Sequence, residues 1–415
     1  MEKAPTVLVV GAGVIGLACA FRIAREGRRV ILVDRAEPGR ATSFGNAGHI
    51  ATEQVFPLAS PEVIRGSLGY LLDRDSPLRI HPRYAFNIAP WLLRFAWAAR
   101  GASFERGTAA IVSLMRTARD DLRDLLWVAE ASDQFHEDGH LVLVERAESV
   151  LAAKAEVWRM RSHGVKAAWR SAGDVQGLVP ELAAPIEGAW HFSGTGHVED
   201  PYAVCQAFEG GFRKAGGEVV QGEVMDIETT ADGIVARMAS GNSLEANQLV
   251  LSAGAWSKPL AARLGHRVPL DTERGYHITM PQAFPTFRLP VASFERKVIM
   301  TPMSVGLRMT GTVEFGGLTL PPDPNRFTSL QRHLKALVPS LPTHDASTWM
   351  GHRPSLPDHL PVLGRVPDGR PIFLAFGHQH LGLTLAGVTA RVVADLVMDR
   401  KTDIDLAPFS PLRFR

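Results

Sequence analysis

The first 34 residues carry the pattern that most restricts how this chain can fold. A short β-branched and apolar run from Thr6 to Val10 leads into a glycine-rich turn. A helical stretch from Leu17 to Glu26 follows, and a second apolar run from Arg29 to Val33 ends on Asp34. A strand, a tight turn, a helix and a second strand in this order are typical of the first βαβ unit of a doubly wound α/β domain. The sequence therefore predicts a parallel sheet that begins at the N-terminus.

The glycine-rich turn has the spacing of a dinucleotide-binding site. Gly11 permits the tight turn, Gly13 lets the backbone approach a pyrophosphate, and Gly16 lets the helix pack close to the sheet. Val14 and Ile15 complete the turn at the start of the helix, whose free N–H groups attract phosphate. The acid that ends the second strand can accept hydrogen bonds from an adenosine ribose. The alternative is a glycine turn that only packs a βαβ unit, but the strands and the acid favour dinucleotide binding.

Further strands of this domain lie far along the chain. The segments Glu218 to Ile227, Gly233 to Ala239 and Gln248 to Ser252 have the β-branched, apolar character of strands. A last strand from Ile372 to Phe376 precedes a turn rich in glycine and histidine, then a helix through about Val397. The cofactor domain is therefore predicted to form from three separated pieces of the chain.

Composition excludes several classes of protein. Hydrophobic residues make up 46% and charged residues 21% of the chain, which is ordinary globular usage. With 45 Lys and Arg against 43 Asp and Glu, the net charge of +2 gives no case for nucleic-acid binding. Two cysteines provide neither a disulfide framework nor a four-cysteine zinc site, and we identify no metal site. No segment has the roughly 18 to 20 apolar residues of a spanning helix, so we expect a cytoplasmic protein.

Six motifs are spread over the chain: GAGVIG with Asp34, TSFGNAGHI, LVLSAGAWS, Arg274-Gly275-Tyr276, Gly351-His352-Arg353-Pro354 and FGHQHLGLT. Together with the three-piece layout, they resemble the D-amino-acid oxidase and dehydrogenase family of FAD enzymes, which includes glycine and sarcosine oxidases. The resemblance covers essentially the whole chain and is greatest to bacterial D-amino-acid dehydrogenases, which carry an SFGNAG run, an RGY motif and a GHGxLG-type turn. Here the last turn reads GHQHLG, so His380 departs from the small residue of that pattern.

The resemblance implies an α/β fold with a Rossmann-like FAD-binding domain and an inserted α+β substrate domain that has a mixed or antiparallel sheet. We place the FAD-binding domain at residues 1–80, 195–268 and 350–415. We place the substrate domain at residues 81–194 and 269–349.

The resemblance also implies where FAD binds. The adenosine half is expected on the turn glycines, Asp34 and Arg35, with Val224 as a backbone partner of adenine. The pyrophosphate linker and the isoalloxazine ring are expected beside Thr42, Ser43, Asn46, Gly48 and His49. Gly254, in the small-residue turn after the strand at Gln248 to Ser252, is also expected to bind the cofactor. The turn before the last helix should place N–H groups at the reduced flavin, through Gly377, His378, Gln379, His380 and Leu381. An ordinary strand-to-helix connection is the alternative for this turn. Since neither cysteine lies in a flavin-contacting motif, we expect FAD to be non-covalent.

Three residues are candidates for substrate binding and catalysis. Arg353 is expected to hold the substrate carboxylate, because arginine has this role in relatives and its planar fork binds two oxygens at once. Tyr276 and His277 are expected on a strand that faces the flavin, where the tyrosine could bind the carboxylate or cap the pocket. The alternatives are a salt-bridged arginine and a tyrosine half-buried in a sheet. His352, on the opposite face of the strand, is expected to be structural.

The implied reaction is the oxidative deamination of a D-amino acid. A hydride leaves Cα for the flavin, water hydrolyses the imino acid to a 2-oxo acid and ammonia, and a quinone-type respiratory acceptor takes the electrons. One alternative is an oxygen-using oxidase or a dehydrogenase of glycine, sarcosine, D-proline or hydroxy-D-proline. Another is a flavin-carrying subunit of a multi-chain electron relay. An NAD-dependent dehydrogenase is disfavoured by the three-piece cofactor domain.

Residues 56–104 are rich in Trp, Leu, Phe and Arg and have two interpretations. They form either a buried helix pair or a patch that enters the lipid interface without crossing it. In the second case Trp91, Leu92 and Phe95 should enter the lipid, and the protein should contact the inner face of the inner membrane. The patch would have a basic rim: Arg65, Arg74, Arg79 and Arg83. Assembly as a homo-oligomer is also compatible with the sequence.

Overall fold

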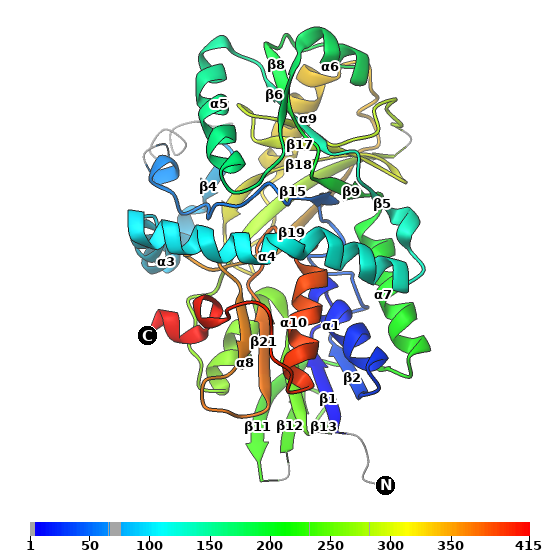
Figure 1. Ribbon diagram of the computed structural model, residues 1–415, viewed down its shortest axis with the longest axis vertical. Coiled ribbons are helices and arrows are strands. Elements are labelled where there is room, and N and C mark those ends of the chain that lie inside the picture. The colour runs from blue at the N-terminus through cyan, green and yellow to red at the C-terminus, as the bar shows by residue number, and fades with distance from the viewer. Residues whose placement is uncertain (1–4, 65, 67–75, 232, 282) are drawn as a thin grey trace.

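The computed structural model describes residues 5–64, 66, 76–231, 233–281 and 283–415. Figure 1 shows two halves, one built on the sheet that contains β1 and the other on the sheet that contains β15. The long helix α4 (Gly101–Val128) crosses the molecule between them. This arrangement agrees with the predicted fold class of a nucleotide-binding α/β domain joined to a domain with a mixed sheet.

The first half is built on a six-stranded sheet with the order β10-β2-β1-β14-β21-β20. All neighbours are parallel except β20, which runs antiparallel to β21 at one edge. The strands, in sheet order, are β10 (Glu218–Gln221), β2 (Arg29–Asp34), β1 (Thr6–Val10), β14 (Gln248–Leu251), β21 (Ile372–Phe376) and β20 (Val362–Arg365). The central strands are apolar along their whole length because both faces of the sheet are covered.

Two apolar layers cover this sheet, and alternate residues of β1 serve each. Val7 and Val9 belong to a core shared with four helices, whereas Leu8 and Val10 belong to a core on the other face. The helices are α1 (Val14–Arg25), α4, α7 (Pro201–Lys214) and α10 (Ala386–Val397). The other face is covered by α8 (Ser257–Arg263) and by the antiparallel strands β11 (Val224–Thr230), β12 (Gly233–Met238) and β13 (Ser243–Ala246).

The second half is built on a nine-stranded mixed sheet whose path runs β19-β15-β18-β17-β16-β6-β8-β7, with β4 paired to β18. In chain order its strands are β4 (Leu78–Ile80), β6 (His140–Val144), β7 (Ala168–Ser171), β8 (Gly188–Phe192), β15 (Asp271–Pro281), β16 (Val291–Ser293), β17 (Val298–Met303), β18 (Gly306–Phe315) and β19 (Ser347–Ser355). Its helices are α3 (Ala85–Ala98), α5 (Ala147–Arg161), α6 (Ala172–Leu178) and α9 (Pro324–Leu337).

A small antiparallel sheet lies where the two halves meet. Its order is β3 (His49–Ile50), β9 (Gly196–Val198) and β5 (Phe135–His136). Strand β3 belongs to the loop that follows β2, β5 comes just before β6, and β9 comes just before α7. The position of this loop is therefore fixed by strand pairing to distant parts of the chain.

Three elements cross the predicted domain boundaries. Strand β4 lies in the segment 1–80 but pairs with β18 of the large sheet, and β19 extends to both sides of residue 350. Helix α4 lies in the segment 81–194, yet its apolar stripe packs into the core beneath the six-stranded sheet. Motifs locate the ends of a cofactor domain, but they contain no information on which half an amphipathic helix will cover.

Two predicted elements differ in their bounds. The single strand expected at Glu218 to Ile227 is two strands in different sheets, separated at Gly222, whose N–H donates to the Asp34 carbonyl at 2.8 Å. The last helix begins at Ala386 instead of directly after the glycine turn. The residues between form further turns, and among them Thr384 accepts a hydrogen bond from the Ala51 N–H at 3.0 Å.

Candidate active site

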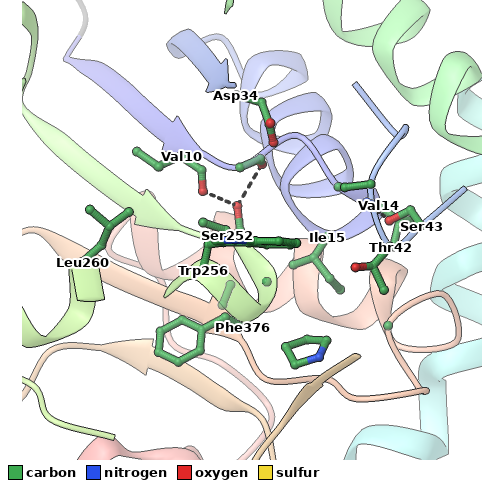
Figure 2. A pocket seen from close by; sticks show the side chains of 18 of the residues that line it. Val10, Val14, Ile15, Asp34, Thr42, Ser43, Ser252, Trp256, Leu260 and Phe376 are labelled. Carbon is green, nitrogen blue, oxygen red and sulfur yellow. Dashed lines mark hydrogen bonds between the residues drawn. The ribbon is translucent and has the colours of Figure 1, made fainter. Parts of the chain in front are cut away.

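A cavity of about 340 Å³ lies at the carboxyl ends of β1, β2, β14 and β21. Figure 2 shows that its labelled side chains come from three separate pieces of the chain. Such a crevice is where open α/β sheets bind their ligands. Among the residues predicted to hold the cofactor, the cavity is lined by Gly11, Gly13, Val14, Ile15, Asp34, Arg35, Thr42, Ser43, Asn46, Val224, Gly254, Gly377, His378 and Gln379.

The glycine turn leaves no room for side chains. A Cβ atom on Gly16 would lie 1.8 Å from the Gly11 carbonyl oxygen, and Gly11 itself has φ +105°. The first N–H of α1, on Val14, donates to the Ser43 hydroxyl at 2.9 Å. A Cβ on Gly13 would come within 3.3 Å of the same hydroxyl. The backbone is therefore bare where the start of α1 meets the cavity, as a pyrophosphate requires.

Asp34 supports this turn while its carboxylate borders the cavity. Its two carboxylate oxygens accept hydrogen bonds from the N–H groups of Ala12 at 2.6 Å and Ala36 at 2.9 Å. Beside it, the Arg35 guanidinium lies 4.1 Å from the ring centroid of Trp256. Arg35 and Trp256 therefore form one wall at the end of the cavity that also contains Val224.

The loop at residues 42–46 is held by the large sheet. Buried Arg308 donates to the carbonyl oxygen of Asn46 at 2.7 Å, and the Thr42 hydroxyl donates to the carbonyl oxygen of His352 at 2.9 Å. The Nδ1 atom of His277 donates to the carbonyl oxygen of Gly45 at 3.1 Å. These bonds connect the cofactor loop to β15, β18 and β19, so the two halves of the molecule fix the loop together.

A second cavity, of about 530 Å³, continues from the first. Thr42, Asn46 and Gln379 line both cavities, so a ligand in the first would reach the mouth of the second. The second cavity lies between the 42–54 segment and the large sheet, and Arg353 and His380 line it. A first cavity that opens into a second one suits a reaction at the far end of an elongated cofactor.

Arg353 presents its guanidinium to the second cavity. The guanidinium covers Gly275, where a Cβ would lie 2.4 Å from Cζ, and Nη1 donates to the Thr312 carbonyl at 3.3 Å. Burial lowers its pKa, an effect that the carboxylate of Glu273 on the neighbouring strand opposes. No carboxylate of the described residues lies within ion-pair distance of Arg353, so donors of its fork are available to a ligand carboxylate.

The other two predicted catalytic residues have different surroundings. Tyr276 borders the second cavity, but its hydroxyl binds Glu314, accepts from Arg274 at 2.9 Å and belongs to a buried ion-pair network. His277 stacks on Trp349, with ring centroids 5.1 Å apart, and packs behind the cofactor loop. Burial lowers its pKa to about 3, so it is neutral at pH 7. The Tyr276 hydroxyl and the His277 ring are therefore both held by contacts within the protein.

The turn after β21 is shaped by two residues with positive φ, Gly377 at +83° and Gln379 at +54°. The side-chain amide of Gln379 is buried and has no hydrogen-bond partner among the described residues. His378 contacts the Thr389 hydroxyl at 3.0 Å, and His380 bonds to the Gln54 side chain. Burial lowers the pKa of both histidines to about 3. An unsatisfied amide at the junction of the two cavities is a group that a bound ring could satisfy.

Four predicted residues line neither cavity: Gly16, Gly48, His277 and Leu381. Gly48 has φ +73° and binds Val198 through its carbonyl oxygen, at 2.8 Å, and Leu381 is part of the apolar core. His49 lines the second cavity beside Glu53 and His140.

Sequence reasoning missed Ser252, Glu53 and His140. Ser252 donates to the carbonyl oxygens of Val10 and Gly11 at 3.0 and 3.1 Å and lines the first cavity. Its place at the end of a predicted strand was a usable signal, because that is where cofactor contacts gather. Glu53 and His140 lie far apart in the sequence, and no local pattern connects them.

Comparisons with known proteins agree with this arrangement. A family model described as "DAO: FAD dependent oxidoreductase" matches residues 6–396. The chain is 33% identical over 432 residues to a D-amino-acid oxidase of Bradyrhizobium diazoefficiens, with 100% of both chains covered. It is 30% identical over 419 residues to D-amino acid dehydrogenase 2 of Pseudomonas aeruginosa, with 98% of both covered. The glycine oxidase structure from Geobacillus kaustophilus superimposes with a TM-score of 0.74 at 25% identity, covering 98% of each chain.

Proposed function

The chain belongs to the DAO family of FAD-dependent oxidoreductases, and from that membership we propose that it oxidises a D-amino acid and passes the electrons to a quinone-type acceptor. The observation that carries the proposal is Arg353, a guanidinium without a carboxylate partner among the described residues, in a cavity continuous with the cofactor cavity. When bound, FAD accepts the hydride that leaves the substrate Cα.

The residues of the first cavity fit FAD. The bare glycine turn and the start of α1 would hold the pyrophosphate, Asp34 would bind the ribose, and Val224 would meet the adenine. Gln379, whose amide lacks a partner among the described residues, would lie at the isoalloxazine ring. We propose that the link is non-covalent. Cys19 and Cys205 are buried in α1 and α7, and burial raises the pKa of both thiols, to about 12 for Cys205.

The residues of the second cavity would bind and orient the substrate. Arg353 would hold the α-carboxylate with two parallel hydrogen bonds, which sets both its position and its angle. Burial works to raise the pKa of Glu273, but a hydrogen bond with His359 and the charge of Arg353 lower it overall. An ionised Glu273 would keep Arg353 in place without occupying its fork. Alignment of Cα with the cofactor would then supply much of the rate.

The acceptor is tested by comparing turnover with a soluble quinone analogue and with dissolved oxygen. We expect the purified holoenzyme, supplied with D-amino acids, to reduce the quinone analogue at least tenfold faster than oxygen. The dehydrogenase relatives support this expectation. The readouts are the loss of quinone absorbance and the formation of peroxide, and the paired L-amino acids serve as controls.

Oxygen-using oxidation is the second candidate, because one relative, 33% identical to the chain, is named D-amino-acid oxidase. Stoichiometric peroxide at a rate comparable to quinone reduction would select it. Preference for glycine, sarcosine or a D-proline in the same screen would select a secondary or small amino acid as substrate. An isolated chain that reduces no acceptor with any of these substrates would indicate a subunit of an electron relay.

We also propose that α3 contacts the inner face of the inner membrane. One side of α3 presents apolar side chains to solvent: Phe86 is 93% exposed, Leu93 74% and Trp97 63%. Leu93 lies seven residues, or about two turns, after Phe86, and Trp97 lies four residues after Leu93. The three side chains therefore share a face of the helix. Arg83, Arg94 and Arg100 are exposed around it, which suits an anionic lipid surface. No helix within the described residues has the length and apolar character needed to span a bilayer.

This face differs from the one that the sequence indicated. Trp91 is only 4% exposed, donates to the Ser355 carbonyl at 3.3 Å and stacks on Phe95. Leu92 and Phe95 pack beside it in a small core. The period of the helix therefore turns these three side chains toward the sheet. Two residues of the predicted basic rim, Arg65 and Arg74, lie outside the described residues, and Arg79 forms an ion pair of 4.0 Å with Asp323.

Replacing Phe86, Leu93 and Trp97 together with serine should lower binding to anionic vesicles by at least tenfold. Each substitution removes apolar surface that would enter the lipid, and the free energy of transferring such surface from water is about 25 cal/mol per Å². Vesicle co-sedimentation measures the binding, and Trp127→Ser on α4 is the control, since that side chain is 73% exposed but lies on another helix. If the wild-type protein stays in the supernatant at low and high salt, this part of the proposal is wrong.

A further inference from the structure

Three buried side chains meet at the wall of the second cavity. His49 is the first residue of β3, Glu53 lies in the turn that follows, and His140 is the first residue of β6. The Nε2 atom of His49 lies 3.7 Å from Glu53 Oε2, and the Nε2 atom of His140 lies 3.9 Å from Glu53 Oε1. The two imidazole rings are 4.3 Å apart at their centroids. One potential ligand atom of each residue therefore points to a common centre.

The hydrogen bonds of His140 fix which of its nitrogens carries the proton. The Thr195 hydroxyl donates its proton to the carbonyl oxygen of Phe192 at 2.9 Å. Its contact with His140 Nδ1, at 3.0 Å, must therefore be one in which Nδ1–H donates. In the neutral imidazole this leaves a lone pair on Nε2, directed at Glu53 and His49. A partner on the far ring nitrogen is the usual support of a metal-binding histidine.

The centre contains acceptors that nothing in the described structure satisfies. His49 Nε2 and Glu53 Oε2 are sealed from solvent and have no hydrogen-bond partner among the described residues. No lysine or arginine of the described residues forms an ion pair with Glu53, whose ion-pair contacts are the two histidines. Burial raises the pKa of Glu53 to about 8, so without a cation this side chain holds a proton, which a bound metal ion would displace.

We propose that His49, Glu53 and His140 bind one divalent transition-metal ion of the zinc or ferrous type. Two histidines and one carboxylate with an open position are a recurrent ligand set for such ions. Bonds of about 2.0 to 2.2 Å place ligand atoms roughly 3.3 to 3.6 Å apart. The separations of 3.7 and 3.9 Å, which run to the two different oxygens of Glu53, need to contract by only a few tenths of an ångström. All the potential ligand atoms lie within 4.8 Å of one another, so the two histidines also have to approach by at most an ångström or so.

The ion would connect three segments that position the active site. It would join β3, which continues the cofactor loop, to β6 of the large sheet through the turn that carries Glu53. It would also face the second cavity, which all three ligands line. The site is independent of the identity of the substrate and of the acceptor.

Equilibrium dialysis of the holoenzyme against Zn²⁺, after removal of metals with a chelator, tests the proposal. We expect about one zinc per flavin in the wild-type protein by elemental analysis, and a melting temperature that rises with zinc concentration. Glu53→Gln and His140→Gln should each weaken zinc binding by at least a hundredfold. Thr195→Val, which removes the support of His140 together with the bond to the Phe192 carbonyl but leaves all three ligands in place, should weaken it about tenfold to a hundredfold. His344→Gln, at an exposed histidine, is the matched control.

Flavin absorbance shows that each variant is folded before zinc is compared. Equal zinc content in the wild type and in the Glu53→Gln, His140→Gln double variant would overturn the proposal. A second result would also overturn the proposal. In it, the wild type binds no more zinc, manganese or ferrous ion than a protein that carries His344→Gln together with Glu53→Gln and His140→Gln. If Glu53→Gln instead raises KM only for a D-amino acid with a cationic side chain, the cluster is a substrate subsite and the metal site is refuted.

Discussion

Replacing Arg353 with alanine should raise KM for the D-amino acid by orders of magnitude while the flavin content stays normal. The guanidinium borders the second cavity and has no ion-pair partner among the described residues, so its fork is available to a substrate carboxylate. Removing one partner of a buried charged pair costs about 3 to 5 kcal/mol. That corresponds to roughly a hundredfold to several thousandfold in kcat/KM. Steady-state kinetics on flavin-normalised protein measures the change.

Lysine at the same position separates charge from geometry. Arg353→Lys keeps a positive charge but gives a point charge without the planar fork, so it should recover only part of the loss. Because the angle between Cα and the cofactor depends on two parallel hydrogen bonds, kcat should stay low even when the substrate saturates the enzyme.

A structural arginine would behave differently. If Arg353 had only a structural role, replacing it would lower the melting temperature or release flavin, and the KM of the surviving enzyme would hardly change. Arg237→Ala is the control, because Arg237 on β12 forms an exposed ion pair with Glu228 on β11. An unchanged KM in Arg353→Lys would remove Arg353 from the substrate site.

The cofactor half of the molecule could be predicted from sequence because its signals are local. The strand, glycine turn, helix and acid between Thr6 and Asp34 occupy the predicted order, and β14 and β21 follow the predicted runs closely. In each case backbone geometry at one turn decides the function. Glycine spacing records that geometry directly, and strand periodicity records burial on both faces.

The substrate half could not be predicted in the same way, because its interactions join distant segments. The motif around Tyr276 indicated a residue that faces the flavin, but it contains no information on the bond between its hydroxyl and Glu314 on the neighbouring strand. Whether Trp91 meets lipid or protein depends on how α3 is rotated against the sheet. The helical period gives the two faces of α3, but only tertiary packing selects the buried one. The meeting of Glu53 with His140 depends on the same kind of packing.

Replacing Gly16 with alanine should abolish stable FAD binding. The added Cβ would lie 1.8 Å from the Gly11 carbonyl oxygen and 2.7 Å from the Ser252 hydroxyl. The first contact is with backbone, so no rotamer change relieves it, and α1 must move away from the turn that receives the pyrophosphate. Overpacking typically costs about 1 to 3 kcal/mol, and the 1.8 Å contact with backbone puts this site at the upper end of that range or above it. That corresponds to at least a hundredfold weaker FAD binding.

Flavin content after gel filtration and the dissociation constant of FAD by fluorescence measure this effect. Gly210→Ala is the matched control, since Gly210 lies inside α7 and a Cβ there would meet no atom within 4 Å. That change should leave FAD binding unaltered and raise stability by about 0.5 to 1 kcal/mol, because alanine favours a helix. If Gly16→Ala retains FAD as firmly as Gly210→Ala does, close packing of α1 on the glycine turn is not what shapes the cofactor cavity. The pyrophosphate would then have to be held chiefly by the loop around Ser43.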